Sequence, residues 1–109
     1  MTAPWIRATP ENLSRVIIGT GVFEIREPTG EVIDIGFAGA LEPFGLRSAL
    51  DRELGHGGAQ GLEFRYEPHV LYMSRFVELV LDHKFRNAGE EPVRLRERGT
   101  HVPGRIRPA

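Results

Sequence analysis

A Gly-x-Gly stretch, Gly19–Gly21, lies between two apolar runs, and glycines in this arrangement are one way to hold a phosphate. A phosphate loop places its glycines between a strand and the N-terminus of a helix, where backbone N–H groups and the helix dipole meet the anion. Here strand-forming residues follow Gly21 and lead into a hairpin. We therefore predict that these glycines bind no phosphate, and that they mark a bulge or make room for Phe37 on the partner strand.

The chain offers little else for catalysis or metal binding. Its four histidines, His56, His69, His83 and His101, form no His-x-x-x-His pair and no Glu-flanked zinc motif. We interpret His83 as a cation at a helix end and the others as structural or loop residues. The absence of cysteine excludes thiol catalysis and cysteine-ligated zinc. The sequence thus predicts no catalytic residue, no metal and no cofactor.

Two carboxylates, Glu24 and Asp34, are expected directly opposite each other on a hairpin. Paired carboxylates can share a proton, bind a divalent cation or hold a partner's arginine. Two acids alone make a poor cation site, so the favoured interpretation is a solvated pair moderated by Arg26. If the hairpin meets another subunit, the pair becomes a receptor for an arginine from that subunit's tail.

Arginines crowd the end of the chain and are candidates for binding a partner. Their alternation on an extended chain would point them to one side, where they could neutralise phosphates. Apolar residues between them favour docking on an acidic protein surface instead, and a solvated tail is the third interpretation. The predicted partner-binding residues of the tail are Arg94, Arg96, Arg98, Arg105 and Arg107, and Trp5 is added because it could attach the N-terminal arm to the body.

A hairpin must position the two carboxylates. Pro28 and Gly30 fit a type I turn followed by a left-handed glycine, between strands that extend from Arg15 to Leu41. With Glu27 opposite Glu31, the large apolar residues near the turn share one face. This register pairs Ile25 with Ile33, Phe23 with Ile35, Gly21 with Phe37, and Glu24 with Asp34.

The remaining pattern predicts an α+β fold. A helical turn follows Thr9, an amphipathic helix runs from Pro43 to Leu54, and Leu62–Tyr66 alternates as a half-buried strand. Segment 68–86 fits either a helix or a strand. We favour the helix because one element then explains the whole run, whereas strands would make the protein mostly β. A brief strand is expected over 93–96.

The 109 residues suit a single domain with extended arms. We divide the chain into an N-terminal arm (1–12), a compact α+β domain (13–91) and a basic, Arg/Pro/Gly-rich C-terminal arm (92–109). The start of the chain does not resemble a signal peptide and no apolar run suits a membrane span. A cytoplasmic or virion-associated location is therefore predicted, with no membrane partner.

Three functions follow in order of preference. The first is a non-enzymatic assembly protein that docks on homo- or hetero-oligomeric protein subunits through its hairpin and arms, such as a head, connector or tail component of a bacteriophage virion. The second is an accessory protein that binds nucleic acid through the arginine tail. The third is a small enzyme or ligand-binding domain centred on His56 and His69.

Overall fold

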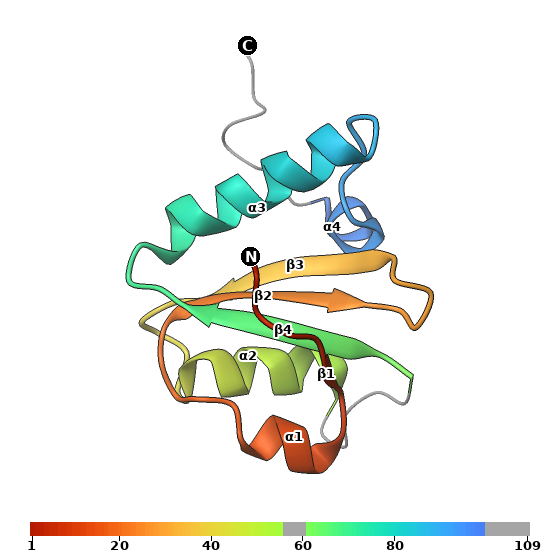
Figure 1. The fold of residues 1–109 in the computed structure, drawn as a ribbon. Helices are drawn as coiled ribbons and strands as arrows, with labels where there is room; N and C mark the ends of the chain where they lie inside the picture. The colour runs from red at the N-terminus through yellow and green to blue at the C-terminus, as the bar shows by residue number, and fades with distance from the viewer. Residues whose placement is uncertain (56–60, 100–109) are drawn as a thin grey trace.

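The computed structural model describes residues 1–55 and 61–99. Four antiparallel strands form one sheet in the order β1-β4-β2-β3. Figure 1 shows α1 and α2 on one face of this sheet, α3 on the other face, and α4 close to β3. The α+β class is confirmed and the mostly-β alternative is wrong. The elements are β1 (Ile6–Arg7), α1 (Pro10–Ser14), β2 (Gly21–Arg26), β3 (Val32–Ala38), α2 (Gly45–Leu54), β4 (Glu63–Pro68), α3 (Tyr72–Arg86) and α4 (Val93–Arg98).

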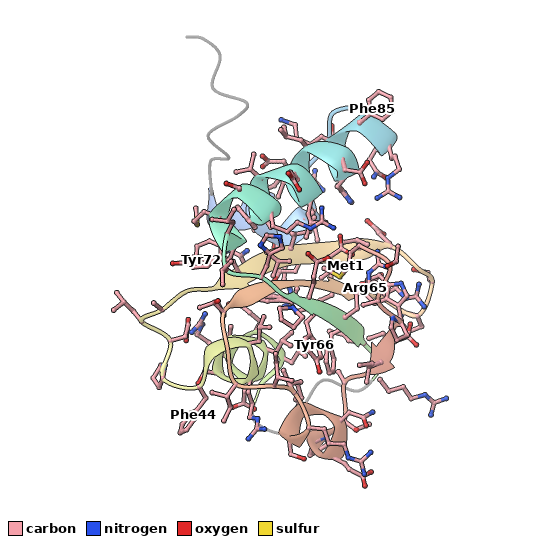
Figure 2. The ribbon with its side chains drawn as sticks, turned by 60° about the vertical axis from the view of Figure 1, so that its left-hand side comes forward. Met1, Phe44, Arg65, Tyr66, Tyr72 and Phe85 are labelled. Carbon is pink, nitrogen blue, oxygen red and sulfur yellow. The ribbon has the colours of Figure 1, made fainter. Side chains whose placement is uncertain are left out.

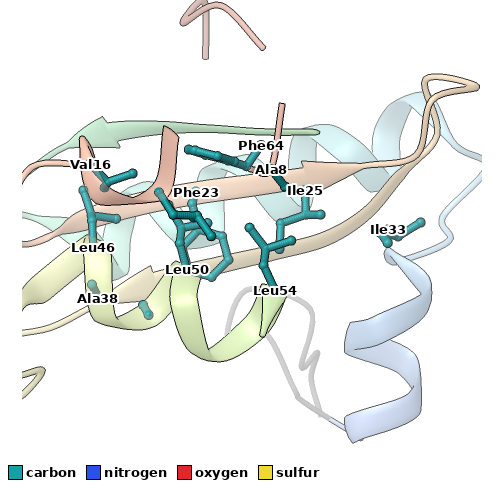
Figure 3. Packing of buried hydrophobic residues seen from close by; sticks show 12 residues of the cluster. Ala8, Val16, Phe23, Ile25, Ile33, Ala38, Leu46, Leu50, Leu54 and Phe64 are labelled. Carbon is teal, nitrogen blue, oxygen red and sulfur yellow. The ribbon is translucent and has the colours of Figure 1, made fainter. Parts of the chain in front are cut away.

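The apolar side of α2 covers the β2–β3 hairpin on the face of the sheet where α1 and α2 lie. Leu46, Leu50 and Leu54 are buried in one cluster with Phe23 and Phe64 (Figure 3). The stripe predicted from helical spacing is therefore confirmed, although the helix begins at Gly45, two residues after the proline expected to open it. The helical turn predicted after Thr9 is also confirmed as α1, because the Thr9 side chain accepts a hydrogen bond from the Asn12 backbone N–H.

The opposite face of the sheet is covered by α3. Phe76 and Val80 pack on Val22 and Ile35, and Leu95 of α4 completes this second cluster. The helix predicted for segment 68–86 is thus confirmed over Tyr72–Arg86, whereas Pro68, expected at its start, is the last residue of β4. Burial of one face of a fifteen-residue helix stabilises it more than helical propensity alone.

The hairpin turn has the predicted form, but the register beyond it differs. Gly30 has φ +98°, and the Glu27 N–H donates to the Glu31 carbonyl over 2.9 Å. Because of a β-bulge next to the turn, Arg26 lies opposite Val32 and Ile25 lies opposite Asp34. The extra residue shifts every later pair by one position, so the predicted pairs are wrong: Phe23 lies opposite Gly36, Val22 opposite Phe37, and Gly21 opposite Ala38.

The strand expected over 93–96 is also wrong, because this segment forms the helix α4. Its Leu95 is fully buried, and Gly99 ends the helix in a left-handed conformation, with φ +69°. Helical spacing places Arg94 and Arg98 on one side, toward the sheet. The part of the C-terminal arm that lies in the described residues therefore packs on the body, and residues 100–109 lie outside them.

Candidate interaction surface

Gly21 serves packing in this fold. A Cβ at this position would overlap the Glu67 carbonyl oxygen of β4 and would lie 2.8 Å from Leu46 Cδ1. The carbonyl of Gly19 accepts a hydrogen bond from the Leu46 N–H over 2.8 Å at the start of α2. Gly21 thus makes room for α2 and β4, and the suggestion that it makes room for Phe37 is wrong.

Glu24 and Asp34 do not form a pair. The bulge places Glu24 opposite Ile35, so the two carboxylates lie on opposite faces of the sheet. Glu24 is 4% exposed, and its Oε1 accepts a hydrogen bond from Arg65 Nε over 2.7 Å. The predicted solvated pair is therefore wrong, since Glu24 is a buried acid that this chain's own arginine neutralises.

Asp34 is fully buried and receives the arginines of α4. Its Oδ1 lies 2.9 Å from Arg98 Nη2, and its Oδ2 lies 3.6 Å from Arg94 Nη1. Burial raises the pKa of Asp34, while the hydrogen bond and the charge of Arg98 act in the opposite direction. Arg94 also donates to the Glu53 carbonyl at the end of α2 over 3.0 Å. These contacts hold α4 against both β3 and α2.

Trp5 attaches the N-terminal arm to the sheet by its ring. The guanidinium carbons of Arg26 and Arg65 each lie 4.3 Å from the ring centroid. Cation–π contacts of this kind contribute about 0.5–1 kcal/mol each where they are exposed. Because Glu63 and Glu24 hold the two arginines, Trp5 has an ordered docking site within its own chain.

The other predicted residues form no common site. Arg96 pairs with Glu90 over 3.2 Å at the surface, while Arg105 and Arg107 lie outside the described residues. His69 Nδ1 accepts a hydrogen bond from the Leu71 N–H over 3.0 Å. Burial lowers the pKa of His83, which opposes its interpretation as a cation.

His56 and His101 also fall outside the described residues. Within 1–55 and 61–99, no three histidine or acidic side chains are grouped so that they could hold a metal ion.

Sequence reasoning missed an exposed apolar end of the sheet. Pairing of Gly21 with Ala38 and Pro68 brings three loops to this end, 15–20, 39–44 and 69–71. Thr20 and His69 join two of these loops by reciprocal hydrogen bonds. Figure 2 shows Phe44 and Tyr72 toward this end and Phe85 far from it. The exposed apolar residues there, which we call the apolar end, are Ile17, Ile18, Leu41, Phe44, Val70, Leu71 and Met73.

The apolar end is unusual for its exposure and for its low charge. Leu41 is 99% exposed and Val70 is 82% exposed. Among residues 15–20, 39–44 and 69–73, Arg15, Glu42 and His69 are the only acidic or basic residues. Loops are ordinarily polar, so apolar residues beside Pro43 and Pro68 were the signal available in the sequence.

Comparison of the chain with models of protein families, with curated proteins and with solved structures gives no match. Among the helices of residues 1–55 and 61–99, none has the length and apolar character needed to cross a membrane. The chemistry of the surface therefore carries the functional argument.

Proposed function

We propose that this protein is a non-enzymatic assembly protein that docks on protein subunits, copies of itself included, through the apolar end. The observation that supports this role is the gathering of five apolar side chains, each more than half exposed, in three adjoining loops. Contiguous exposed apolar surface with a polar surround is typical of protein interfaces. The five residues are Ile18, Leu41, Phe44, Val70 and Leu71.

The energy available from this surface suits protein association. Complete burial of one large apolar side chain stabilises a complex by about 1.5–3 kcal/mol. Five such residues therefore contribute on the order of 10 kcal/mol, from which the entropy lost on association must be subtracted. Loss of translational and rotational freedom costs about 4–15 kcal/mol. The apolar end can therefore supply a large part of a protein interface, with polar contacts at its rim adding specificity.

The nucleic-acid alternative has less support from the described residues. Arg94 and Arg98 already contact the buried Asp34, so a phosphate would compete with a carboxylate of the same chain. That alternative now depends on the exposed Arg96 and on Arg105 and Arg107. A bacteriophage virion component remains one example of the assembly role that we propose.

Light scattering tests this proposal. The mass of the wild-type protein is measured over a concentration series at low and high salt, with and without DNA. We expect an oligomer that persists at high salt, because burial of uncharged apolar surface is not screened. Leu41→Asp combined with Val70→Asp should return the protein to a monomer by placing charges in the interface.

Phe85→Asp is the matched control, since Phe85 is 88% exposed at the far end of α3. It should leave the oligomer intact. A monomer at every concentration, with a mass that changes only when DNA is added at low salt, would overturn the proposal and favour nucleic acid.

A further inference from the structure

Leu41 projects from the end of the sheet on a turn that the rest of the chain holds in place. The Glu42 N–H donates to the Gly39 carbonyl over 3.2 Å and closes a β-turn. Ala40 and Leu41 occupy the two central positions of this turn. Arg52 of α2 donates to the Glu42 carboxylate over 2.8 Å and so attaches the turn to the body. Leu41 is nevertheless 99% exposed, so the fold presents a large apolar side chain that it leaves in water.

A hollow of about 360 Å³ lies beside Leu41. The rings of Phe37 and Tyr72, whose centroids are 5.7 Å apart, stack on each other and line it. Gly39 makes room for Tyr72, because a Cβ at Gly39 would lie 2.9 Å from Tyr72 Oη. The hollow therefore offers aromatic surface, of the kind that receives an apolar side chain.

This hollow and Leu41 together make the surface self-complementary. Leu41 borders the hollow but does not fill it, since a side chain packed there would not be 99% exposed. When two copies meet about a two-fold axis, the same surface of each copy contacts the other, and each Leu41 can enter the opposite hollow. Two-fold dimers are also the commonest oligomers of soluble proteins.

The charges around the hollow permit contact between two identical surfaces. Such a contact brings like charges near each other, and like charges are destabilising where they are not neutralised. The Glu42 side chain is only 20% exposed and is paired with Arg52. Arg15, in the neighbouring loop, pairs with Glu11 over 3.3 Å. Two copies can therefore meet at the apolar end without strong repulsion.

We propose that the partner bound at the apolar end is a second copy of this chain, related by a two-fold axis, and that Leu41 of each copy packs in the Phe37–Tyr72 hollow of the other. Leu41 is the anchor of this contact because it is the most exposed large apolar residue of those that the structure describes. This inference rests on the proposed docking role of the apolar end, and it names the partner and the central contact.

Complementation between two variants tests the exchange of Leu41. Leu41→Ala removes the inserted side chain, and Phe37→Glu places a carboxylate in the hollow. We expect each variant alone to self-associate at least tenfold more weakly than wild type. A mixed dimer keeps one intact Leu41 facing one intact hollow, whereas a dimer of either variant keeps no complete contact. The mixed dimer should therefore form at least tenfold more tightly than either variant dimer, as measured by the anisotropy of one labelled variant.

Phe85→Glu is the matched control for the added carboxylate, because Phe85 is 88% exposed at the far end of α3. It should self-associate as wild type does. If mixing Leu41→Ala with Phe37→Glu gave no tighter dimer than either variant alone, the exchange would be wrong.

Should Phe37→Glu fail to fold, disulfide trapping decides. The chain has no cysteine, so only introduced cysteines can pair. A tagged Leu41→Cys chain, mixed with an untagged Ala40→Cys chain and mildly oxidised, should yield a mixed dimer, because Ala40 lines the hollow that Leu41 enters. A Phe85→Cys chain should not be trapped. Equal trapping of Ala40→Cys and Phe85→Cys would indicate random collision and exclude the contact.

The two proposals fail in different ways. If Leu41→Asp with Val70→Asp dissociated a wild-type oligomer but neither complementation nor trapping occurred, the apolar end would be an interface without the exchange of Leu41. A wild-type monomer at every concentration, with a mass that does not respond to DNA, would exclude a second copy as the partner. Docking on a different protein subunit would then be the role of the apolar end.

Discussion

Arg98 is the residue on which the buried carboxylate of Asp34 depends most. With Arg98→Ala, the nearest remaining cation is Arg94, at 3.6 Å. Removing one partner of a buried ion pair leaves an uncompensated charge and is strongly destabilising. Because Arg98 is partly exposed, we expect the free energy of unfolding in urea to fall by about 2–4 kcal/mol, somewhat less than for a fully buried pair.

Two further variants check this prediction. Arg96→Ala removes the adjacent exposed pair with Glu90 and should change the unfolding free energy by less than about 0.5 kcal/mol. Adding Asp34→Asn to Arg98→Ala should restore part of the loss, because it removes the orphaned charge. Similar losses for Arg96→Ala and Arg98→Ala would contradict the role assigned to Arg98.

At the scale of elements, Gly19, in the loop before β2, and Gly21, the first residue of β2, are expected to respond very differently to replacement by alanine. Gly21→Ala forces a Cβ against Leu46 and the backbone of β4, so we expect it to destabilise the protein by about 1–3 kcal/mol or more. At Gly19, the nearest atom to an added Cβ is Ile17 Cδ1, at 3.9 Å, and Gly19→Ala should be tolerated. Thermal unfolding measures both. Equal melting temperatures would disprove the packing role of Gly21.

The elements also show what sequence alone can predict. The turn was predictable because Pro28 and Gly30 restrict backbone angles locally. The bulge was not, since Val32 and Ile33 are both β-branched apolar residues and either could oppose Arg26. One undetected residue was enough to move Asp34 to the other face of the sheet.

Tertiary contacts decide the form of α4. Val93–Arg96 alternates apolar and basic residues, a strand pattern, yet packing of Leu95 in the core and binding of Arg98 to Asp34 favour a helix. The candidate site was unpredictable for a similar reason. Its apolar residues come from three loops that only the sheet pairing brings together.

At the scale of the whole molecule, stability should fall on acidification. Burial lowers the pKa of His83 below its ordinary 6.5, with Arg86 acting in the same direction and Glu24, Asp82 and Glu31 opposing it. As the pH falls below 6.5, the unfolded chain therefore binds more protons at His83 than the folded chain does. The free energy of unfolding is highest above pH 6.5 and decreases as the pH falls through the lower pKa of the folded state. His83→Gln should flatten urea-unfolding stability between about pH 7 and about pH 5.

Two carboxylates modify the dependence of stability on pH in more acidic solution. The hydrogen bond from Arg75 lowers the pKa of Glu67, so its contribution is also lost on acidification, below the ordinary value of 4.5. The raised pKa of Asp34 acts in the opposite direction, because its protonation in the folded state favours folding. A His83→Gln profile identical to wild type above about pH 5 would exclude the role of His83.

The strand order has a consequence for synthesis on the ribosome. Because β4 lies between β1 and β2, Ile6–Arg7 has no partner strand until Glu63–Pro68 has emerged. Until then the growing chain holds a hairpin with two open edges, and the second core cluster still lacks Leu95 from α4. The nascent protein thus completes its sheet only after β4 has emerged and closes its second core cluster later still, so chaperones can meet its open strands before then.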